Sequence, residues 1–561
     1  MSEPWLPSDH GSEKGPLQKK VARGLTWTLI DTWGSQLLGL IVFVLLARLL
    51  TPVDFGLVAL ASVFVAFAQL LVDQGLGDAL IQRQSLTRRQ IDTAFWVAVL
   101  TGALLTVGTI LLAGPIATLL GEPAIEPIIQ ALSLTFVAVA LNSIQMGLLR
   151  REMKFRSLAV RKLLAVGIGG AVGIAMAVMN YGAWALVGQQ LVAAGVSVIA
   201  LWTVSPWRPG FHFSRADFRQ LFAFGINVVA GDLLNFLSRN VDRLLIGAFL
   251  GPTLLGFYAV AYRILDTSQV LLVNAARKLA FPVFSRLQND RDRMRRAYSR
   301  VTRALAVIIL PGYIGLALVA PEAVVFIFGA EWAESGPVAA ILFLIGPVLT
   351  VQLFSGALLN AVGHPEVTFR IRLITAIVNV IGFVIAVAVF QEITAVAAAY
   401  VIRGYLLMPL IMLWLKKYAG IPISAHLGEL RSPALATIVM STAVVAVKLV
   451  LTGNVSTFVL LAAETITGVV TFLLAIIVID RALLNEVVTL IAQSVPGGER
   501  LARRFGVNIP ETPGGGKKRG RKREQPQDTN DEETRHEVAA AEAEVEEAFT
   551  PDPGLRNTSD V

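Results

Sequence analysis

An almost unbroken succession of apolar segments fills the chain from Gly24 to Asp480, and this pattern restricts the fold more than any single motif does. Short charged patches separate the segments, whereas the polar linkers that join soluble domains are missing. Hydrophobic residues make up 55% of the chain and charged residues 16%. In soluble proteins, hydrophobic residues average about 45–50% and charged residues about 25%. The pattern predicts a membrane-embedded protein and excludes a water-soluble or disordered one.

The length of the apolar segments indicates helices. A helix needs about 20 mostly apolar residues to cross a hydrocarbon core of about 30 Å. About 14 segments meet this requirement: 24–49, 55–80, 91–113, 125–149, 158–179, 182–203, 218–249, 254–280, 303–320, 336–359, 369–390, 393–415, 433–452 and 455–480. Barrel strands would instead give alternating segments about 10 residues long. The sequence therefore predicts an all-α polytopic membrane protein.

Lys and Arg residues gather in every second loop. They precede the first predicted helix and follow the second, fourth, sixth, eighth, tenth and twelfth, whereas the intervening loops are neutral or acidic. Because cytoplasmic loops carry the excess of Lys and Arg, both chain ends are predicted to be cytoplasmic. The polar stretch from Met1 to Lys20 has no apolar core, so no cleavable signal peptide is predicted. The net charge of +8 is thus explained by Lys and Arg in cytoplasmic loops, and nucleic acid is not expected as a partner.

An internal repeat with a spacing of 200 residues indicates a duplicated bundle. Five of the twelve positions coincide between residues 50–61 and 250–261: Leu50, Pro52, Gly56, Ala59 and Ala61 align with Leu250, Pro252, Gly256, Ala259 and Ala261. Pro and Gly also recur in membrane loops by chance. If the repeat is real, six helices per half give both halves the same orientation, related by a pseudo-twofold axis along the membrane normal. Transporters with alternating access are built in this way.

The repeat and the charge pattern together predict the domain organisation. The predicted parts are a cytoplasmic N-terminus (1–22), an N-terminal six-helix bundle (23–205), a cytoplasmic linker (206–217), a C-terminal six-helix bundle (218–416), two additional transmembrane helices (417–480), an interfacial segment (481–510) and a disordered cytoplasmic tail (511–561).

Arginines are predicted near the middle of the membrane in the C-terminal half. Arg239 and Arg263 each lie twelve residues from the turn at Gly251. At about 1.5 Å per residue both sit about 18 Å from that turn. Arg403 is predicted at a similar depth, and Arg243 lies one turn from Arg239 on the same face. A guanidinium matches phosphate oxygens bidentately, so these arginines are candidates for binding a pyrophosphate head group.

The same arginines have a structural alternative. Arg239 and Arg243 can pair with Asp242, Asp232 or Asp266 and fasten two helices together. Arg243, predicted nearer the outer surface, can also extend its head to the interface. The sequence leaves these alternatives open.

Intramembrane carboxylates form a second set of candidates. They are Asp31, Asp73, Asp232, Asp266 and Glu464. Desolvation favours the protonated form of a buried carboxyl, so such a group can carry a coupling proton; beside backbone carbonyls it can hold Na⁺. Helix-to-helix hydrogen bonding is the alternative for each of them.

Three segments resemble a known transporter family. They are residues 47–56 (ARLLTPVDFG), residues 240–251 (NVDRLLIGAFLG) with 255–258 (LGFY), and residues 149–155 (LRREMKF). They are similar to the polysaccharide-transporter family of the multidrug/oligosaccharidyl-lipid/polysaccharide exporter superfamily, and the last resembles its colanic-acid-exporter branch. The likeness extends over about residues 17–480.

The resemblance implies two six-helix bundles plus two helices. It also implies export of undecaprenyl-pyrophosphate-linked oligosaccharide across the bacterial inner membrane. Lipid II flippases carry arginines early in the first helix, and residues 26–31 contain none, which disfavours lipid II as the substrate. Membrane lipids, a coupling H⁺ or Na⁺ and a polysaccharide polymerase complex are the other expected partners.

Two further functions are carried as alternatives. A cation-coupled multidrug exporter would favour acidic sites, whereas the charges predicted at mid-depth are mostly basic. A non-transporting scaffold of a polysaccharide synthesis complex would use the tail. An enzyme is not expected, because no nucleophile–base set, metal-ligand cluster or phosphate-binding loop stands out and the chain has no cysteine. No cofactor is expected either.

Overall fold

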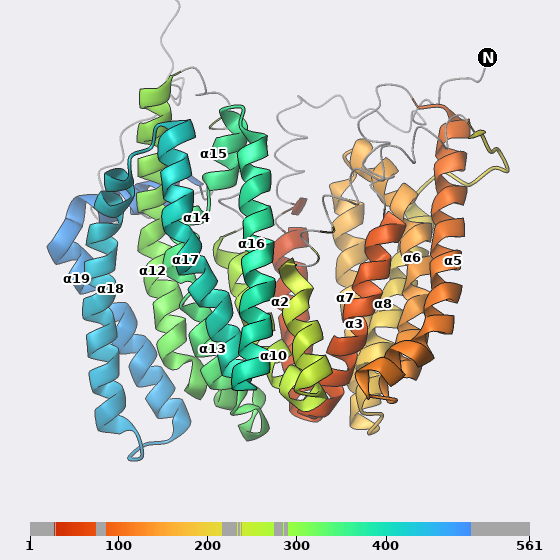
Figure 1. The fold of residues 1–561 in the computed structure, drawn as a ribbon, viewed down its shortest axis with the longest axis horizontal. Coiled ribbons are helices and arrows are strands. Elements are labelled where there is room, and N and C mark those ends of the chain that lie inside the picture. Colours follow the sequence, from red (N-terminus) through yellow and green to blue (C-terminus); the bar gives the residue numbers. More distant parts are fainter. Residues whose placement is uncertain are drawn as a thin grey trace, which may run out of the picture. The chain divides into compact units, whose positions relative to one another are not determined.

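The computed structural model shows a protein built from helices (Figure 1). It describes residues 27–28, 30–73, 86–215, 233, 236, 238–273, 284 and 290–494. The chain divides into two units, Met1–Leu490 and Ile491–Val561, and the helices that could cross a membrane belong to the first. Helices make up nearly all of the regular structure among the described residues, which confirms the all-α prediction.

Twelve helical stretches in the described part of the chain are long and apolar enough to cross a membrane. Their outer faces carry large apolar side chains, with Leu119 86% and Val478 85% exposed. Apolar surface of this extent is stable in lipid rather than in water. The polytopic fold is confirmed. The expected number of fourteen stays a prediction, because most of the expected span 218–249 and the end of 254–280 lie outside the described residues.

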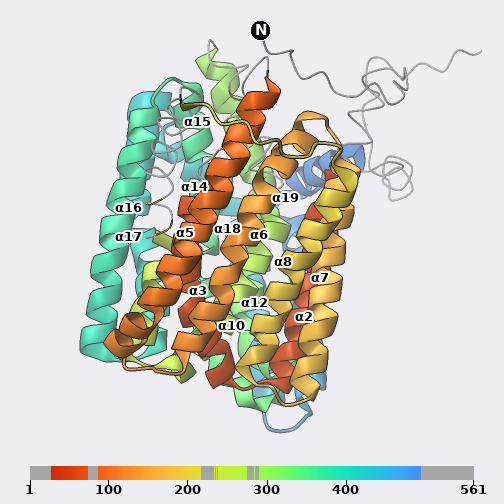
Figure 2. The same cartoon turned by 90° about the vertical axis from the view of Figure 1, so that its right-hand side faces the viewer.

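The first group of helices precedes residue 205. It consists of η1 (Ile30–Gly34), α2 (Ser35–Leu49), α3 (Pro52–Asp73), α5 (Arg88–Leu120), α6 (Ile125–Arg151), α7 (Phe155–Val178) and α8 (Ala183–Val204). Helices α5 and α6 pack together, as do α7 and α8, and α6 also contacts α3 and α8. Figure 2 shows α5, α6, α7 and α8 side by side. We call this group the N-lobe.

Local signals set the ends of these helices. Before α5, the Thr87 side chain accepts the backbone N–H of Gln90, and the Gln90 side chain accepts that of Thr87. This reciprocal pair satisfies two donors that a helix start leaves free. At the other end Gly121 adopts a left-handed conformation with φ 69°, which a residue without Cβ reaches easily.

The second group, which we call the C-lobe, follows residue 250. It consists of α10 (Pro252–Leu272), α12 (Arg291–Phe328), η2 (Ala330–Trp332), α13 (Ser335–Phe343), α14 (Gly346–Gln352), α15 (Ser355–Ala361), α16 (Pro365–Ile385), η3 (Ala386–Phe390) and α17 (Ile393–Ala419). Helix α12 packs on α13 and α14, α10 on α13, and α16 on α17.

The expected single helix at 336–359 is wrong in detail, because the structure divides this span into α13, α14 and α15. Pro347 lies at the start of α14 and has no N–H to continue the preceding helix. The break is closed by short-range bonds, with the N–H of Leu344 on Ile341 O and that of Ile345 on Leu342 O. Together the three pieces still have the length and apolarity of one span.

Two further helices, α18 (Ile423–Leu451) and α19 (Thr457–Ser494), pack beside α12. Their common core includes Val307 of α12, Met440 of α18 and Phe472 of α19. At Asp480 the backbone leaves the helical region, with φ −156° and ψ 71°, so α19 bends there. The bend lies where the membrane span was expected to end and the interfacial segment 481–510 to begin.

The two lobes meet where α3 crosses α10. A Cβ on Gly56 would lie 1.7 Å from Pro252 O, and a Cβ on Gly256 would lie 1.9 Å from Pro52 O. Both distances are far below van der Waals contact, so each crossing position requires glycine. The two contacts are reciprocal and join the repeat-equivalent residues, as a local twofold relation requires. The crossing therefore supports the 200-residue repeat.

Candidate functional site

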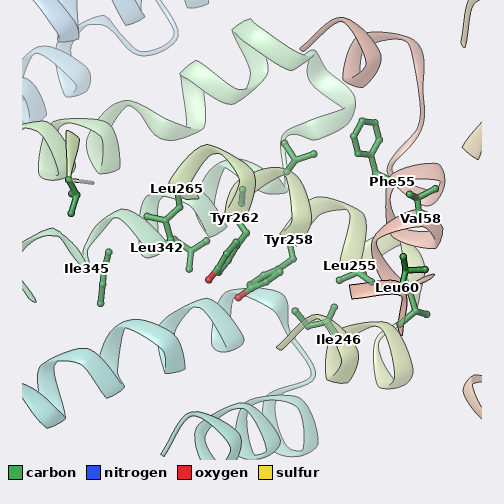
Figure 3. Close-up of a cluster of buried hydrophobic side chains, with 14 of the residues drawn as sticks. Phe55, Val58, Leu60, Ile246, Leu255, Tyr258, Tyr262, Leu265, Leu342 and Ile345 are labelled. Atoms are coloured by element: carbon green, nitrogen blue, oxygen red, sulfur yellow. The ribbon is translucent and has the colours of Figure 1, made fainter. Parts of the chain in front are cut away.

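The core around the lobe crossing holds a buried carboxylate. Asp242, in the helical segment 238–249, is 2% exposed. Its Oδ2 accepts the Tyr258 hydroxyl at 2.7 Å, and its Oδ1 accepts the backbone N–H of Arg243 at 2.9 Å. Figure 3 shows Tyr258 beside Tyr262 in this core, with both hydroxyls directed the same way. Both Asp242 oxygens are thus bonded, which gives Asp242 a structural role.

The Arg243 guanidinium does not pair with Asp242. It lies 5.1 Å from the centre of the Tyr262 ring and 4.0 Å from Asp266 Oδ2 on α10. A cation over an aromatic face is attracted by the ring electrons, and at 4.0 Å the carboxylate adds attraction without a tight hydrogen bond. Its Nε is buried and has no hydrogen-bond partner among the described residues. Arg243 therefore retains donor capacity.

Asp266 lies among three arginines. The charges of Arg243, Arg239 and Arg263 all act on its carboxylate. Arg239 is exposed, whereas the side chains of Arg243 and Asp266 are 28% and 40% exposed. Three guanidiniums with two carboxylates, Asp266 and the Asp242 on which Arg243 also acts, leave an excess of positive charge. We call Asp266 and the three arginines the arginine cluster.

Arg263 extends from the C-lobe to the N-lobe. Its guanidinium carbon lies 5.8 Å from the centre of the Phe43 ring on α2. Its Nη2 would lie 3.7 Å from a Cβ on Gly39, one turn earlier on that helix. A larger residue at Gly39 would therefore contact the guanidinium. The arginine cluster is located at the boundary between the lobes.

Arg403 on α17 is connected to the cluster through aromatic rings. Its guanidinium carbon lies 4.6 Å from the centre of the Tyr400 ring, and Tyr400 meets Tyr262 edge to face at 6.1 Å. Tyr262 in turn lies against Arg243. The Nε of Arg403, like that of Arg243, is buried without a hydrogen-bond partner among the described residues.

Two of the other predicted carboxylates, Asp31 and Glu464, lie elsewhere in the described part of the chain. Asp31 in η1 lies in the N-lobe, where its charge acts on Arg161 of α7. Asp73 ends α3, and Asp232 lies outside the described residues. Glu464 on α19 is 0% exposed and faces Lys448 Nζ at 3.8 Å. The structure thus brings together Arg239, Arg243, Arg263, Arg403 and Asp266, and it places Asp31 and Glu464 elsewhere.

The sequence interpretation missed the aromatic part of the site. Tyr258 and Tyr262 are spaced four residues apart on α10, and this spacing places both on one helical face. That signal was present in the sequence. Phe43 and Tyr400 gave no comparable signal, because only the tertiary fold brings their rings to Arg263 and Arg403.

Hydrogen bonds fasten the two lobes at one end. Arg48, at the end of α2, donates from Nε to Ile327 O at 2.7 Å and from Nη2 to Phe326 O, both at the end of α12. Trp332 donates from Nε1 to Ala47 O at 2.7 Å. These three bonds join the turn of the first predicted hairpin to the corresponding end of the C-lobe. We call them the latch.

A comparison with known families decides where the chain belongs. Residues 45–337 match the family described as polysaccharide biosynthesis protein, which is more than half of the chain. The chain is a member of the polysaccharide biosynthesis protein family. The matched region contains the latch, the lobe crossing and the arginine cluster, whereas Arg403 lies beyond it.

Relatives within and around this family are similar over most of their length. The chain is 29% identical to the succinoglycan biosynthesis transport protein ExoT of Rhizobium meliloti (strain 1021), over 64% of this chain and 73% of that protein. It is 26% identical to the lipopolysaccharide biosynthesis protein WzxC of Escherichia coli (strain K12), over 72% and 86%. It is also 26% identical to the probable flippase AglR of Haloferax volcanii, over 61% and 73%.

A solved structure shares the fold. The lipid II flippase MurJ in its inward closed conformation superposes with a TM-score of 0.66, covering 82% of this chain and all of that one, at 15% sequence identity. At this identity the likeness establishes the fold alone. The protein of the polysaccharide biosynthesis family described here is therefore a multi-pass membrane protein with a transporter fold.

Proposed function

We propose that this protein is a flippase that moves undecaprenyl-pyrophosphate-linked oligosaccharide across the bacterial inner membrane by alternating access. Its place would be in the biosynthesis of a cell-surface polysaccharide. The observation that carries the proposal is the arginine cluster at the boundary between the lobes. The relatives named as transport proteins and flippases support the same class.

The cluster has the chemistry that an anionic head group requires. Pyrophosphate presents several oxygens, and a guanidinium donates to two of them at once. The charges of Arg239, Arg243 and Arg263 act on Asp266, so a bound pyrophosphate would replace that carboxylate as the partner of several arginines. In this role Arg239, Arg243, Arg263 and Arg403 bind the head group.

The latch and the glycine crossing describe one end state of the cycle. They close the end of the bundle at which α2 ends and α10 begins. With both chain termini cytoplasmic, this end is periplasmic and the conformation is closed to the outside. Release of the oligosaccharide then requires the latch to break and the lobes to separate at α3 and α10.

The proposal also covers the coupling ion, the two moving bundles and the recipient of the product. Asp266 is the carboxylate best placed to couple head-group binding to a proton or Na⁺, because it alone of the described candidates lies among the arginines. Residues 23–205 and 218–416 are proposed to form the two bundles that move relative to each other. A polysaccharide polymerase complex is the proposed recipient of the product.

Complementation tests the proposal. Arg239→Ala and Arg263→Ala are introduced into the protein in a bacterial strain that lacks its own polysaccharide flippase, and exported polymer is measured together with membrane levels of the protein. We expect each change to reduce export at least about tenfold, since each removes a charge-assisted contact to phosphate. Arg372→Ala, at an exposed arginine of α16, is the matched control and is expected to export normally.

Full export by both variants would refute a role for the cluster in head-group binding. A wild-type protein that restores no polymer but lowers susceptibility to cationic drugs would instead indicate a multidrug exporter. Purified protein in vesicles that translocates no lipid-linked head group would indicate a scaffold.

A further inference from the structure

A stripe of arginines marks the first turns of α12. Arg296, Arg300 and Arg303 recur at spacings of four and three residues, which places them on one side of the helix, and Arg295 precedes Arg296 directly. They line a hollow of about 620 Å³ together with Asp292 of α12 and, across from them, Ser424, Gly428 and Glu429 of α18. Four guanidiniums and two carboxylates leave the hollow with a positive excess.

Arg303 of this hollow has two acidic partners. Arg303 donates to Asp480 at the bend of α19 and lies 3.6 Å from Glu429. Arg295, Arg296 and Arg300 are exposed at the wall of the hollow. Like charges one turn apart repel each other, so an anion bound among them would relieve this repulsion.

The same side of α12 continues into an apolar groove. Val307, Pro311, Gly315 and Val319 follow Arg303 at intervals of four residues and line a cavity of about 390 Å³. Met440 and Val444 of α18 and Phe472 and Leu473 of α19 form its other walls. From Val307 to Val319 the groove follows about 18 Å of helix.

The polar lining of this groove is confined to two side chains. Glu464 and Thr465 of α19 belong to it. Lys448 Nζ lies 2.8 Å from Glu322 Oε2 and 3.8 Å from Glu464 Oε1, and neither Glu464 oxygen has a hydrogen-bond partner among the described residues. The remainder of the lining is suited to a hydrocarbon chain.

We propose that the seam of α12 with α18 and α19 binds an anionic phospholipid of the surrounding membrane, with its phosphate among the arginines and an acyl chain in the groove. The basic hollow and the apolar groove meet on consecutive turns of α12, as the head and chain of one lipid do. Arg303 joins α12 to α18 and α19, so the bound phosphate would stabilise this attachment. The site is separate from the arginine cluster and does not depend on the transported substrate.

Lipid retention measured by native mass spectrometry tests the site. The full-length protein is purified from membranes in mild detergent and titrated separately with phosphatidylglycerol, phosphatidylcholine and undecaprenyl phosphate. We expect phosphatidylglycerol to be retained at least about tenfold better than phosphatidylcholine. The Arg295→Glu/Arg296→Glu variant should lose this preference, since each basic side chain contributes to the attraction of an anionic head group.

Two matched variants keep the result interpretable. Arg370→Glu/Arg372→Glu reverses two exposed arginines of α16, outside the seam, and should retain phosphatidylglycerol as the wild type does. Gly315→Leu fills the groove and should lower retention, whereas Gly315→Ala should not, because a Cβ there meets only Met440 Cε at 3.9 Å. Gel filtration and thermal unfolding establish that each variant is folded.

Three outcomes would overturn the inference. They are equal retention of phosphatidylglycerol and phosphatidylcholine, unchanged retention in the Arg295→Glu/Arg296→Glu variant, and stronger binding of undecaprenyl phosphate than of phosphatidylglycerol at this seam. Displacement of the bound lipid by inorganic phosphate alone would show a phosphate site without a chain site and would also overturn it.

Discussion

At the residue scale, Asp242 and Tyr258 determine how the arginines are presented. Asp242 accepts the Tyr258 hydroxyl and the Arg243 backbone N–H, so it makes no hydrogen bond to the Arg243 guanidinium, although the charge of Arg243 acts on it. The Arg243 guanidinium instead lies over the Tyr262 ring and 4.0 Å from Asp266 Oδ2. The buried hydrogen bond therefore both stabilises the fold and keeps a cation available.

Tyr258→Phe removes this hydrogen bond and nothing else. We expect it to destabilise the protein by about 1–3 kcal/mol, because Oδ2 of Asp242, a residue that is 2% exposed, then lacks its donor. Thermal unfolding in detergent measures the effect. Tyr405→Phe is the matched control, since its hydroxyl donates to the backbone oxygen Leu344 O at 2.9 Å from a side chain that is 43% exposed, so its loss leaves no buried carboxylate without a donor. Equal unfolding temperatures of the two variants would contradict a buried role for Tyr258.

At the element scale, the crossing of α3 and α10 depends on two glycines. Gly56→Ala and Gly256→Ala each place a Cβ against a proline carbonyl of the other helix. We expect each to weaken the crossing by about 1–3 kcal/mol, as overpacking does, and to lower the unfolding temperature of the closed form. Because the two positions are equivalent, the two losses should be similar.

Gly108→Ala on α5 is the control for the crossing, because a Cβ there meets nothing within 4 Å. It should leave the unfolding temperature unchanged or raise it, since alanine favours a helix over glycine. A Gly56→Ala variant as stable as Gly108→Ala would show that α3 and α10 are not in contact in the purified protein.

The crossing also shows how far sequence reasoning reached. Apolar run length located most helices, because a span of fixed thickness requires a fixed number of residues. The repeat singled out the Pro and Gly positions of both hairpins, but the packing of these two turns against each other was not predicted. The division of 336–359 into three helices was not predicted, since Pro347 lies within an apolar run long enough for one span.

Side-chain partners were harder to predict than elements. Depth along the helix placed Arg239, Arg263 and Arg403 at one level, but depth says nothing about which way a side chain points. The pairing of Arg243 with Tyr262 and Asp266 rather than Asp242 depends on how α10 packs against segment 238–249. The roles of these residues in binding stay predictions until the arginine variants are measured.

At the scale of the whole molecule, alternating access requires the latch to open in every cycle. The hydrogen bonds between the lobes among the described residues are those of Arg48 and Trp332, all at one end. A covalent link at that end should therefore stop transport, for as long as it is intact, while leaving the protein folded. The chain contains no cysteine, so a cross-linking reagent can react only with the thiols that are introduced.

The Arg48→Cys/Phe326→Cys variant, treated with a cleavable bis-maleimide in reconstituted vesicles, replaces the latch by such a link. We expect translocation of the lipid-linked head group to fall to background on cross-linking and to recover on cleavage. Each single-cysteine variant, treated identically, shows the effect of the substitution and of the reagent alone. If the linked protein translocates as fast as the unlinked one, the lobes do not separate at this end, and the head group must cross by a path other than the one that the latch closes.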